Sequence, residues 1–442
     1  MLKNNPTVQV SSLSKTDTLI SIALIGLLFF IFGFVTWINA ILIPFFKIAC
    51  ELNYLESYLV AFAFYIAYLF MSLPAGYLLK KFGFKKGMML GFWVMGIGAL
   101  LFVPAGLTRT YWVFLTGLFT LGIGLAILQT AANPYITILG PKDRAAQRFS
   151  VMGICNKMAG ILAPLLFSAV VLRPDDSALF RQIETIKGAQ KSLILDELIE
   201  RVVMPYAIVA LILLFLGFFV RFSPLPEIDT ESESEALAAS NSDKKSILDF
   251  PYLVLGAIAI FFHVGSQVIA VDSIVNYASA NGMEFMAAKS FPSYTLSATI
   301  IGYILGISFI PKLLSQLAAL KICTVLGLCL SCCILLVSGK VQWFGKDVDI
   351  SVWFVVLLGF ANSMIWAGVW PLALDNLGRF IKTGASLLIM ALCGNAIMPL
   401  LYGYWADNHG LREAYWVLIP CYLYLIFYAF YGHALKKWRF QK

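Results

Sequence analysis

The chain has 442 residues, of which 60% are hydrophobic and 13% are charged, with a formal net charge of +8. Soluble domains carry about 25% charged residues, so this composition excludes a soluble globular protein and indicates a membrane protein with many spans. The basic residues fall in short clusters between apolar runs, as in "KKFGFKK" at 80–86, which is typical of membrane topology signals and not of a nucleic-acid-binding surface.

Twelve apolar runs of about 20 residues predict twelve transmembrane helices, whereas barrel strands would alternate over about ten residues. The first six helices are expected at 20–45, 55–79, 87–106, 111–139, 147–172 and 203–222. The second six are expected at 250–279, 290–314, 319–338, 351–377, 383–405 and 413–434.

A polar, acidic segment at 223–249 divides these helices into two sets of six. The predicted domains are a cytoplasmic tail at 1–19, an N-terminal bundle at 20–222, a cytoplasmic linker at 223–249, a C-terminal bundle at 250–434 and a cytoplasmic tail at 435–442. Similar strings recur in corresponding helices of the two sets, such as "APLLF" in the fifth helix and "MPLLY" in the eleventh. This parallel repeat predicts an all-α membrane protein with the major facilitator fold, two pseudo-symmetric six-helix bundles and a substrate site between them at the bilayer midplane.

An even number of spans places both termini on one side of the membrane. The short loops on that side carry Lys80, Lys81, Lys85, Lys86, Lys142, Arg144, Arg148, Lys312, Lys321, Arg379 and Lys382, against Lys47, Arg109, Lys289, Lys340, Lys346 and Arg412 on the other side. Because basic residues are retained in the cytoplasm, we expect a multi-pass protein of the plasma (inner) membrane with both termini cytoplasmic. The polar segment at 173–201 is then an outer cap.

Polar side chains interrupt the apolar sequence at one depth in the fourth and fifth helices. In "ILQTAANPY", Gln129 and Asn133 lie four residues apart on one helix face, and Pro134 deprives a backbone carbonyl of its helical donor. Gln129 and Asn156 each lie roughly 13–16 Å from the cytoplasmic ends of their helices, near the middle of the membrane. Carboxamides supply donors and acceptors without charge, so Gln129, Asn133 and Asn156 are candidate sugar-binding residues. Hydrogen bonding between helices is the alternative.

Two ionisable residues are expected inside the membrane. Lys157 lies near mid-membrane, where a charge is costly and needs a polar partner or a wet cavity. The seventh helix carries Gln267, Asp272 and Asn276, and Asp272 is the best-placed intramembrane carboxylate. We predict cation coupling through Asp272 and Lys157 and substrate contacts from Gln267 and Asn276. A static ion pair, or exposure of Asp272 to outer water, is the alternative.

The tenth and eleventh helices add three candidate substrate-binding residues. Asn362 and Trp366 are four residues apart, and the indole can stack on a pyranose while the amide bonds its rim. Asn395 is the third, and core packing or lipid contact is the alternative for Trp366. No metal site, cofactor or enzymatic activity is predicted, because the eight cysteines are scattered and the three histidines form no convergent set.

Several segments resemble the fucose–proton symporter family of the major facilitator superfamily. They are "FFIFGFVTWINAILIPFFK", "GYLLKKFGFKKG", "LQTAANPYITILGP", "MGICNKMAGILAPL" and "LGRFIKTGASLLIMALCGNAIMPLLYG". Within that family, "AAQRFSVMGICNK" and "LGRFIKTGASLL" look more like the glucose/galactose transporter branch than the L-fucose permeases. The resemblance implies import of a hexose by alternating access, driven by a cation gradient.

The resemblance also identifies departures from the family. Two acidic residues of the L-fucose permeases, linked to proton coupling and sugar binding, are replaced here by Ala40 and Gln129. Lys80 stands where an aspartate is common in the inner-loop motif of the superfamily. The positions that match polar or aromatic site residues are Asn39, Asn156, Gln267 and Trp366. Because a neutral Gln129 cannot cycle a proton, coupling either moves to Asp272 or is absent.

We therefore predict a secondary active transporter that imports a glucose- or galactose-like hexose, coupled to sodium or protons. The alternatives are a permease for L-fucose or another monosaccharide, an uncoupled sugar facilitator, and an exporter of lipophilic molecules with an all-apolar cavity. Its expected partners are the sugar and the lipid bilayer, with no nucleic acid, and the expected state is a monomer.

Overall fold

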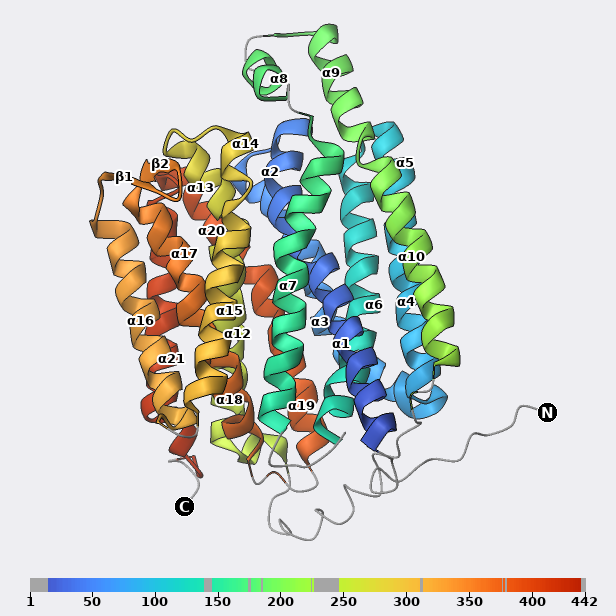
Figure 1. The fold of residues 1–442 in the computed structure, drawn as a ribbon, viewed down its shortest axis with the longest axis vertical. Helices are drawn as coiled ribbons and strands as arrows, with labels where there is room; N and C mark the ends of the chain where they lie inside the picture. The colour runs from blue at the N-terminus through green and yellow to red at the C-terminus, as the bar shows by residue number, and fades with distance from the viewer. Residues whose placement is uncertain are drawn as a thin grey trace, which may run out of the picture.

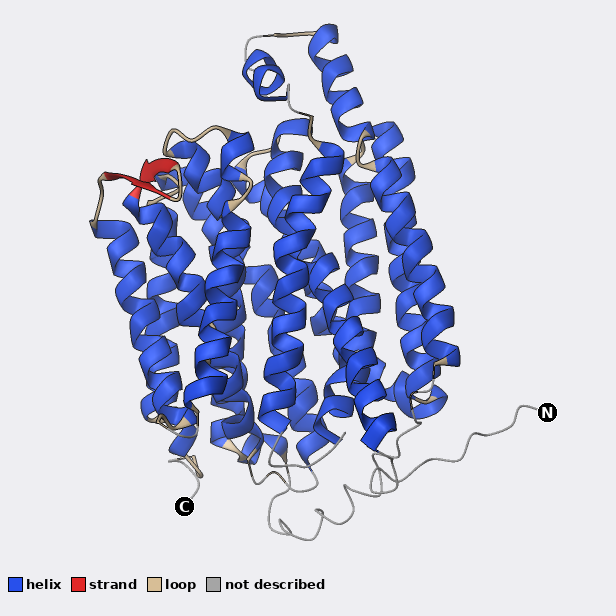
Figure 2. Ribbon diagram, in the orientation of Figure 1, coloured by secondary structure: helices blue, strands red, loops and turns tan. Residues whose placement is uncertain are grey.

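In a computed structural model, the protein is a bundle of long helices that run side by side (Figure 1), with helix as the dominant secondary structure throughout (Figure 2). The structure describes residues 15–138, 145–173, 176–183, 186–223, 225, 246–310, 313–375, 377 and 380–438. Most of the predicted N-terminal tail and linker, and the end of the C-terminal tail, lie outside the described residues.

The first six predicted spans correspond to helices in the first half of the chain. These are α1 (Lys15–Trp37) with α2 (Asn39–Ala49), α3 (Tyr54–Phe82), α4 (Phe84–Leu100) with α5 (Phe102–Thr108), α6 (Tyr111–Ile138), α7 (Ala145–Val171) and α10 (Val203–Phe222). Helix α6 continues past Pro134 to Ile138, so the proline does not end it. Two further helices, α8 (Asp176–Ile183) and α9 (Ala189–Glu200), lie above one end of the bundle (Figure 1).

The second half repeats this arrangement. Its helices are α12 (Pro251–Asp272) with α13 (Ile274–Ala280), α15 (Phe291–Phe309), α16 (Gln316–Leu336), α17 (Ile350–Asn362) with α18 (Ile365–Leu374), α19 (Ile381–Met390) with α20 (Gly394–His409), and α21 (Leu418–Phe430). Short pieces are α14 (Phe285–Ala288), 3-10 turns at Ile247–Asp249, Ala391–Cys393, Glu413–Val417 and Gly432–Ala434, and an antiparallel hairpin of β1 (Lys340–Trp343) and β2 (Lys346–Asp349). The hairpin was not expected from the sequence.

Among the described residues, eleven helical segments are long and apolar enough to cross a membrane. The predicted eighth span is not one of them, although α15 lies beside the others along the bundle (Figure 1). Its serines, threonines and tyrosines, such as Ser293, Thr295 and Tyr303, lower its hydropathy, and these three side chains are buried against other helices. The predicted all-α membrane architecture is confirmed.

Several spans are interrupted within their length, which the sequence did not predict. The interruptions fall at Ile38, Leu101, Ser273, Ser363–Met364 and the 3-10 turn Ala391–Cys393. Such breaks free backbone groups and often mark hinges or binding sites in transporters. Here they lie next to predicted site residues, since Asn39 follows the first break and Asp272 precedes the third.

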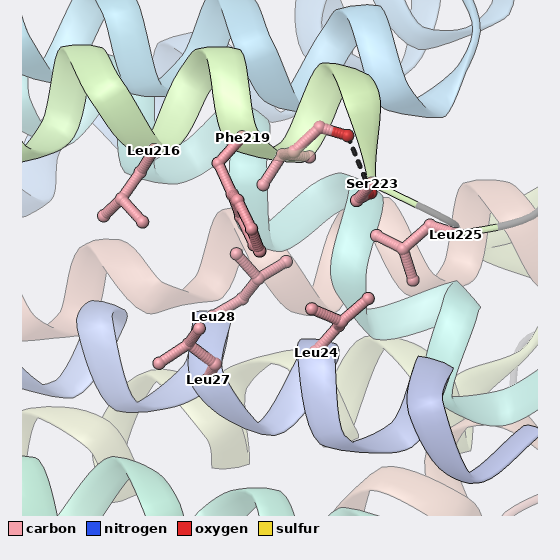
Figure 3. Close-up of a pocket in the computed structure, with 8 residues that line it drawn as sticks. Leu24, Leu27, Leu28, Leu216, Phe219, Ser223 and Leu225 are labelled. Atoms are coloured by element: carbon pink, nitrogen blue, oxygen red, sulfur yellow. Dashed lines mark hydrogen bonds between the residues drawn. The ribbon is translucent and has the colours of Figure 1, made fainter.

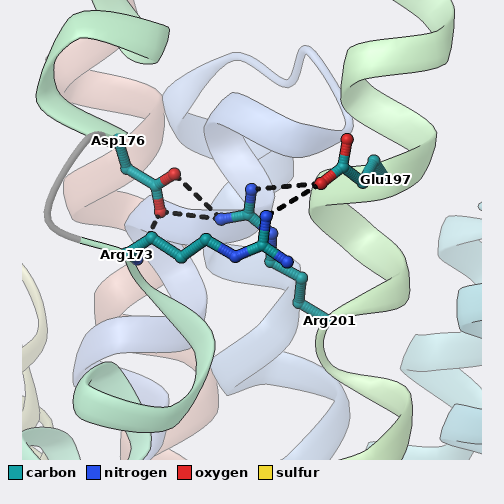
Figure 4. A network of polar contacts seen from close by, with 4 residues as sticks. All are labelled: Arg173, Asp176, Glu197 and Arg201. Atoms are coloured by element: carbon teal, nitrogen blue, oxygen red, sulfur yellow. Dashed lines mark hydrogen bonds and ion pairs between the residues drawn. The ribbon is translucent and has the colours of Figure 1, made fainter.

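The end of the bundle where α2 meets α3, opposite Lys15 and the turn Gly432–Ala434, is called the distal end below (Figure 1). An ionic network holds α8 and α9 together over this end (Figure 4). Arg201 contacts the Asp176 carboxylate at 2.8 Å, and Glu197 accepts from Arg173 at 3.1 Å. The described residues of 173–201 therefore form two helices held together by ion pairs over the distal end.

The two bundles meet along α3 with α20 and along α7 with α15. Ser293 of α15 donates a hydrogen bond to the carbonyl of Ile161 of α7, with a distance of 2.9 Å. At the distal end, Gly403 of α20 lies so close to α3 that an added Cβ would sit 3.1 Å from the backbone of Tyr54 and Leu55. The absence of a side chain at Gly403 thus permits this close helix contact.

Candidate functional site

A cavity of about 130 Å³ lies between the two bundles and combines polar and aromatic side chains. Its lining comes from α1, α3, α6 and α7 of the first bundle and from α12, α18, α20 and the turn before α20 in the second. The lining residues are Thr36, Trp37, Tyr65, Tyr68, Gln129, Asn156, Lys157, Val264, Gln267, Val268, Trp366, Leu392 and Asn395. Six of the predicted site residues therefore meet at one place: Gln129, Asn156, Lys157, Gln267, Trp366 and Asn395.

Asn156 is held in place by α1. Its Oδ1 accepts a hydrogen bond from Trp37 Nε1 at 3.1 Å, and its Nδ2 donates to the carbonyl of Phe29 at 3.3 Å. The helices approach closely because Gly33 has no side chain; an added Cβ would lie 2.1 Å from the Asn156 carbonyl oxygen. The alternative expectation, hydrogen bonding between helices, thus describes Asn156 in this structure, and the same bonds orient its amide at the cavity wall.

Lys157 bridges the two bundles through neutral groups. Its Nζ donates to Gln267 Oε1 at 3.1 Å and lies 3.9 Å from the centre of the Trp37 ring, a cation–π contact. The side chain is only 5% exposed. The structure does not bring Lys157 into an ion pair with Asp272, the counter-charge considered from the sequence, because its described contacts are with an amide and an indole.

The remaining walls are amides and aromatic rings. Gln129 interacts with the Tyr68 side chain. The Trp366 ring stacks on Trp370, with centroids 5.0 Å apart and an interplanar angle of 23°. Asn395 Oδ1 is buried and has no hydrogen-bond partner among the described residues. An acceptor left unsatisfied in a polar cavity is available to a ligand or to water.

Asp272 lies outside the cavity lining, toward the distal end. It is the last residue of α12, five positions after Gln267, which corresponds to about 7.5 Å along the helix axis. Its side chain is 1% exposed, and both carboxyl oxygens lack a hydrogen-bond partner among the described residues. Tyr58 and Tyr65 of α3 lie within its electrostatic range. Asp272 is therefore buried between the bundles, which removes the expectation that outer water solvates it.

The other predicted residues do not line the cavity. Asn39 is fully buried and lies near Tyr65, and Asn362 accepts a hydrogen bond from the Tyr422 hydroxyl at 3.1 Å. The remaining two are Asn133, which is partly buried on α6, and Asn276, which lies near Tyr58. Their predicted substrate contacts stay predictions.

Sequence reasoning missed three aromatic residues of the site, which are Trp37, Tyr65 and Tyr68. The two tyrosines are three residues apart, so they share a face of α3, and their rings are stacked with centroids 6.4 Å apart. That spacing was the available signal. Trp37 directly precedes the interruption at Ile38, and no sequence feature had marked that break.

A second crevice, between α1 and α10, differs in chemistry from the cavity (Figure 3). It holds about 10 Å³ and is lined by leucines, Phe219 and Val220, together with Ser223. The Ser223 hydroxyl donates to the Val220 carbonyl at 2.7 Å, so it is already used within its own helix turn. This crevice is a gap between apolar helix surfaces and is too small to accept a ligand.

The helical membrane architecture and an amide-lined cavity between two bundles define a multi-pass transporter and not an enzyme. Residues 25–393 match the model of the Major Facilitator Superfamily, and the chain belongs to this family. It is 33% identical to a "Glucose/galactose transporter" of Brucella abortus biovar 1 (strain 9-941), over 97% of this chain and 98% of the relative. It is 28% identical to an "L-fucose-proton symporter" of Escherichia coli (strain K12), over 92% of this chain and 93% of the relative.

Solved structures show the same fold. A crystal structure described as a Major Facilitator Superfamily transporter, FucP, in the outward conformation matches with a TM-score of 0.69 and 25% identity, over 93% of this chain and 98% of that chain. A D-xylose-proton symporter matches with a TM-score of 0.62 and 15% identity, over 95% of this chain and 98% of that chain, a likeness of fold alone. The family resemblance seen in the sequence motifs is confirmed.

Proposed function

We propose that this chain is a secondary active transporter that imports a hexose by alternating access, with a coupled cation. The observation that carries the proposal is the cavity between the bundles, where Gln129, Asn156 and Asn395 present amides beside the Trp366 ring. Amides match the donors and acceptors of sugar hydroxyls, and an aromatic ring suits the apolar face of a pyranose. The names of the relatives, glucose/galactose transporter and L-fucose–proton symporter, agree with this substrate class.

Uptake of labelled hexoses into membrane vesicles tests the site. Gln129→Ala and Asn156→Ala are each expected to reduce uptake by about 5- to 150-fold, since a lost hydrogen bond in a buried polar site costs about 1–3 kcal/mol. Thr130→Ala is the matched control, because the Thr130 hydroxyl donates to the Ala126 carbonyl in its own helix at 2.7 Å. Unchanged uptake by both site variants, with normal insertion, would show that sugar binds elsewhere.

We further propose that Asp272 binds the coupling cation, either a proton or sodium. A charged carboxylate without a partner is strongly unfavourable in a buried site, so Asp272 in this environment needs a bound proton or a metal cation. The relatives named as fucose–proton symporters favour the proton. Gln129 is neutral at the cavity itself, which leaves Asp272 as the nearby acidic group of the second bundle.

Two measurements, gradient-driven accumulation and counterflow, distinguish a defect in cation coupling from a defect in sugar binding. Asp272→Asn is expected to abolish accumulation driven by an imposed proton or sodium gradient, while counterflow between equal cation concentrations continues. The gradient that drives the wild type identifies the ion. If the variant still accumulates sugar against its gradient, Asp272 is not the coupling group. If neither gradient drives the wild type, the protein is an uncoupled facilitator.

We place both termini in the cytoplasm and the protein, as a monomer, in the inner membrane. The bundles at 20–222 and 250–434 follow from the apolar runs, and the cytoplasmic side of the linker at 223–249 follows from the distribution of lysine and arginine between the loops. The distal end is then the outer face. Impermeant labels should reach a cysteine introduced at Phe344, which is exposed in the β1–β2 turn, from outside intact cells. Labelling at this position only after permeabilisation would reverse the topology.

A further inference from the structure

The cavity contains a lysine, Lys157, that has no acidic partner in its described contacts. The Lys157 ammonium contacts Gln267 Oε1 and the Trp37 ring, both of which are neutral. The ion pairs given by the described residues lie at the distal end, where they hold the cap, as in Arg201–Asp176. The positive charge of Lys157 is therefore balanced by no carboxylate in its described contacts.

The cavity lining reinforces this imbalance. The lining residues include no aspartate or glutamate, and Lys157 is their one basic residue. The carboxyl of Asp272 lies outside the lining and bonds to no described residue. A buried ammonium that is unneutralised makes the cavity attractive to an anion, because a ligand charge placed there is poorly screened by water.

The Lys157 ammonium also has an N–H group that its described contacts do not use. It carries three N–H groups, of which one is used by Gln267, and it faces Trp37 on another side. One donor is left for a group inside the cavity. A carboxylate is the simplest anionic group found on a hexose derivative. The neighbouring amides of Gln129, Asn156 and Asn395 can bind the hydroxyls of such a sugar.

We infer that the preferred substrate of this site is an acidic sugar, a hexuronate, whose carboxylate binds Lys157. This inference rests on the proposed function, since it specifies the hexose that the site takes. Lys157 then determines specificity, and the cavity amides orient the rest of the ring.

Direct binding to the purified protein tests this inference, with the fluorescence of the cavity tryptophans as the readout. Glucuronate and galacturonate are expected to bind at least about tenfold more tightly than glucose and galactose at pH 7, the usual advantage of a hydrogen bond to a charged group. Lys157→Gln is expected to remove this preference, so that uronates bind this variant no more tightly than neutral hexoses bind the same variant. Lys157→Arg should retain it.

The matched control is Lys191→Gln, which removes the same charge from the distal cap, where Lys191 pairs with Glu51 at 2.6 Å. Its preference for uronates should equal that of the wild type. Neutral hexoses that bind the wild type as tightly as the uronates would overturn this inference and leave the proposed function standing. If the wild type binds no hexose, neutral or acidic, the proposed function fails and this inference fails with it. The relative affinities of the wild type for uronates and neutral hexoses test the inference even if Lys157→Gln does not fold.

Discussion

A carboxylate of the second bundle closes the distal end of the interface by capping a helix of the first. Asp407 of α20 accepts hydrogen bonds from the backbone N–H groups of Tyr54 and Leu55, at 2.9 and 2.8 Å. These residues begin α3, where the amides have no partner within the helix and the helix dipole favours a negative charge. Beneath this contact, the rings of Tyr58 and Tyr402 pack edge to face with centroids 5.6 Å apart. Opening the distal end requires these contacts to break.

The free energy that these two hydrogen bonds contribute depends on their geometry and on the exposure of Asp407 to solvent. A hydrogen bond to a charged group contributes about 1.5–3 kcal/mol when shielded, but the Asp407 side chain is exposed, so solvent screening reduces it. We assign about 1–2 kcal/mol to the two bonds together. Asp407→Ala should then shift the balance between closed and open distal ends by about 5- to 30-fold toward the open state.

The assay is the rate at which an impermeant maleimide, added from the distal side, modifies a cysteine that replaces the cavity residue Thr36, in a chain whose eight native cysteines have been removed. Asp407→Ala should increase this rate by the same 5- to 30-fold. Asn408→Ala is the matched control, because Asn408 donates only to the Tyr404 carbonyl of its own helix in the described contacts. Equal rates for Asp407→Ala and Asn408→Ala would show that Asp407 does not hold the distal end closed.

Two further predictions concern stability, measured by thermal unfolding of the purified protein. Gly33→Ala should destabilise by about 1–3 kcal/mol and impair uptake, because its Cβ would collide with the Asn156 carbonyl, whereas Gly76→Ala, with nothing within 4 Å of an added Cβ, should be nearly neutral. Arg201→Ala removes the guanidinium partner of the buried Asp176 carboxylate and should cost about 3 kcal/mol. Arg173→Ala breaks an ion pair whose two side chains are each 62% exposed and should cost less than about 1 kcal/mol. Similar losses for the members of either pair would contradict this account.

The positions of the membrane helices could be predicted from the sequence, but the positions of their interruptions could not. A span of about 20 apolar residues has few alternatives in a membrane, so hydropathy located the helices closely. The breaks at Ile38 and Ser273 involve residues that are common inside helices, so no glycine or proline marked them. The consequence is visible at Asn362 and Trp366. Their four-residue spacing places them on one face only in a continuous helix, and the break at Ser363–Met364 separates them.

Only some of the cavity residues could be predicted from the sequence. Gln129, Lys157 and Gln267 were recognisable because a polar group stands out in an apolar segment. Tyr65 and Trp37 were not, because aromatic residues make up 14% of the chain and are ordinary in membrane helices. Their role depends on which helix face meets the other bundle, and this is set by packing between segments distant in sequence.

A ligand shifts a conformational equilibrium only by interacting differently with the two states. Coupling therefore requires a group that interacts both with the substrate cavity and with the contacts that close the distal end. Asp272 meets this requirement by position. It lies within electrostatic range of Tyr65, which lines the cavity, and of Tyr58, which packs against Tyr402 at the closed distal end. In the proposed coupling, a cation bound at Asp272 would remove a buried charge from beside both tyrosines and so would favour the packed state. A permanently neutral amide at this position would mimic the loaded carboxyl and leave sugar binding intact. For this reason Asp272→Asn should abolish accumulation and spare counterflow.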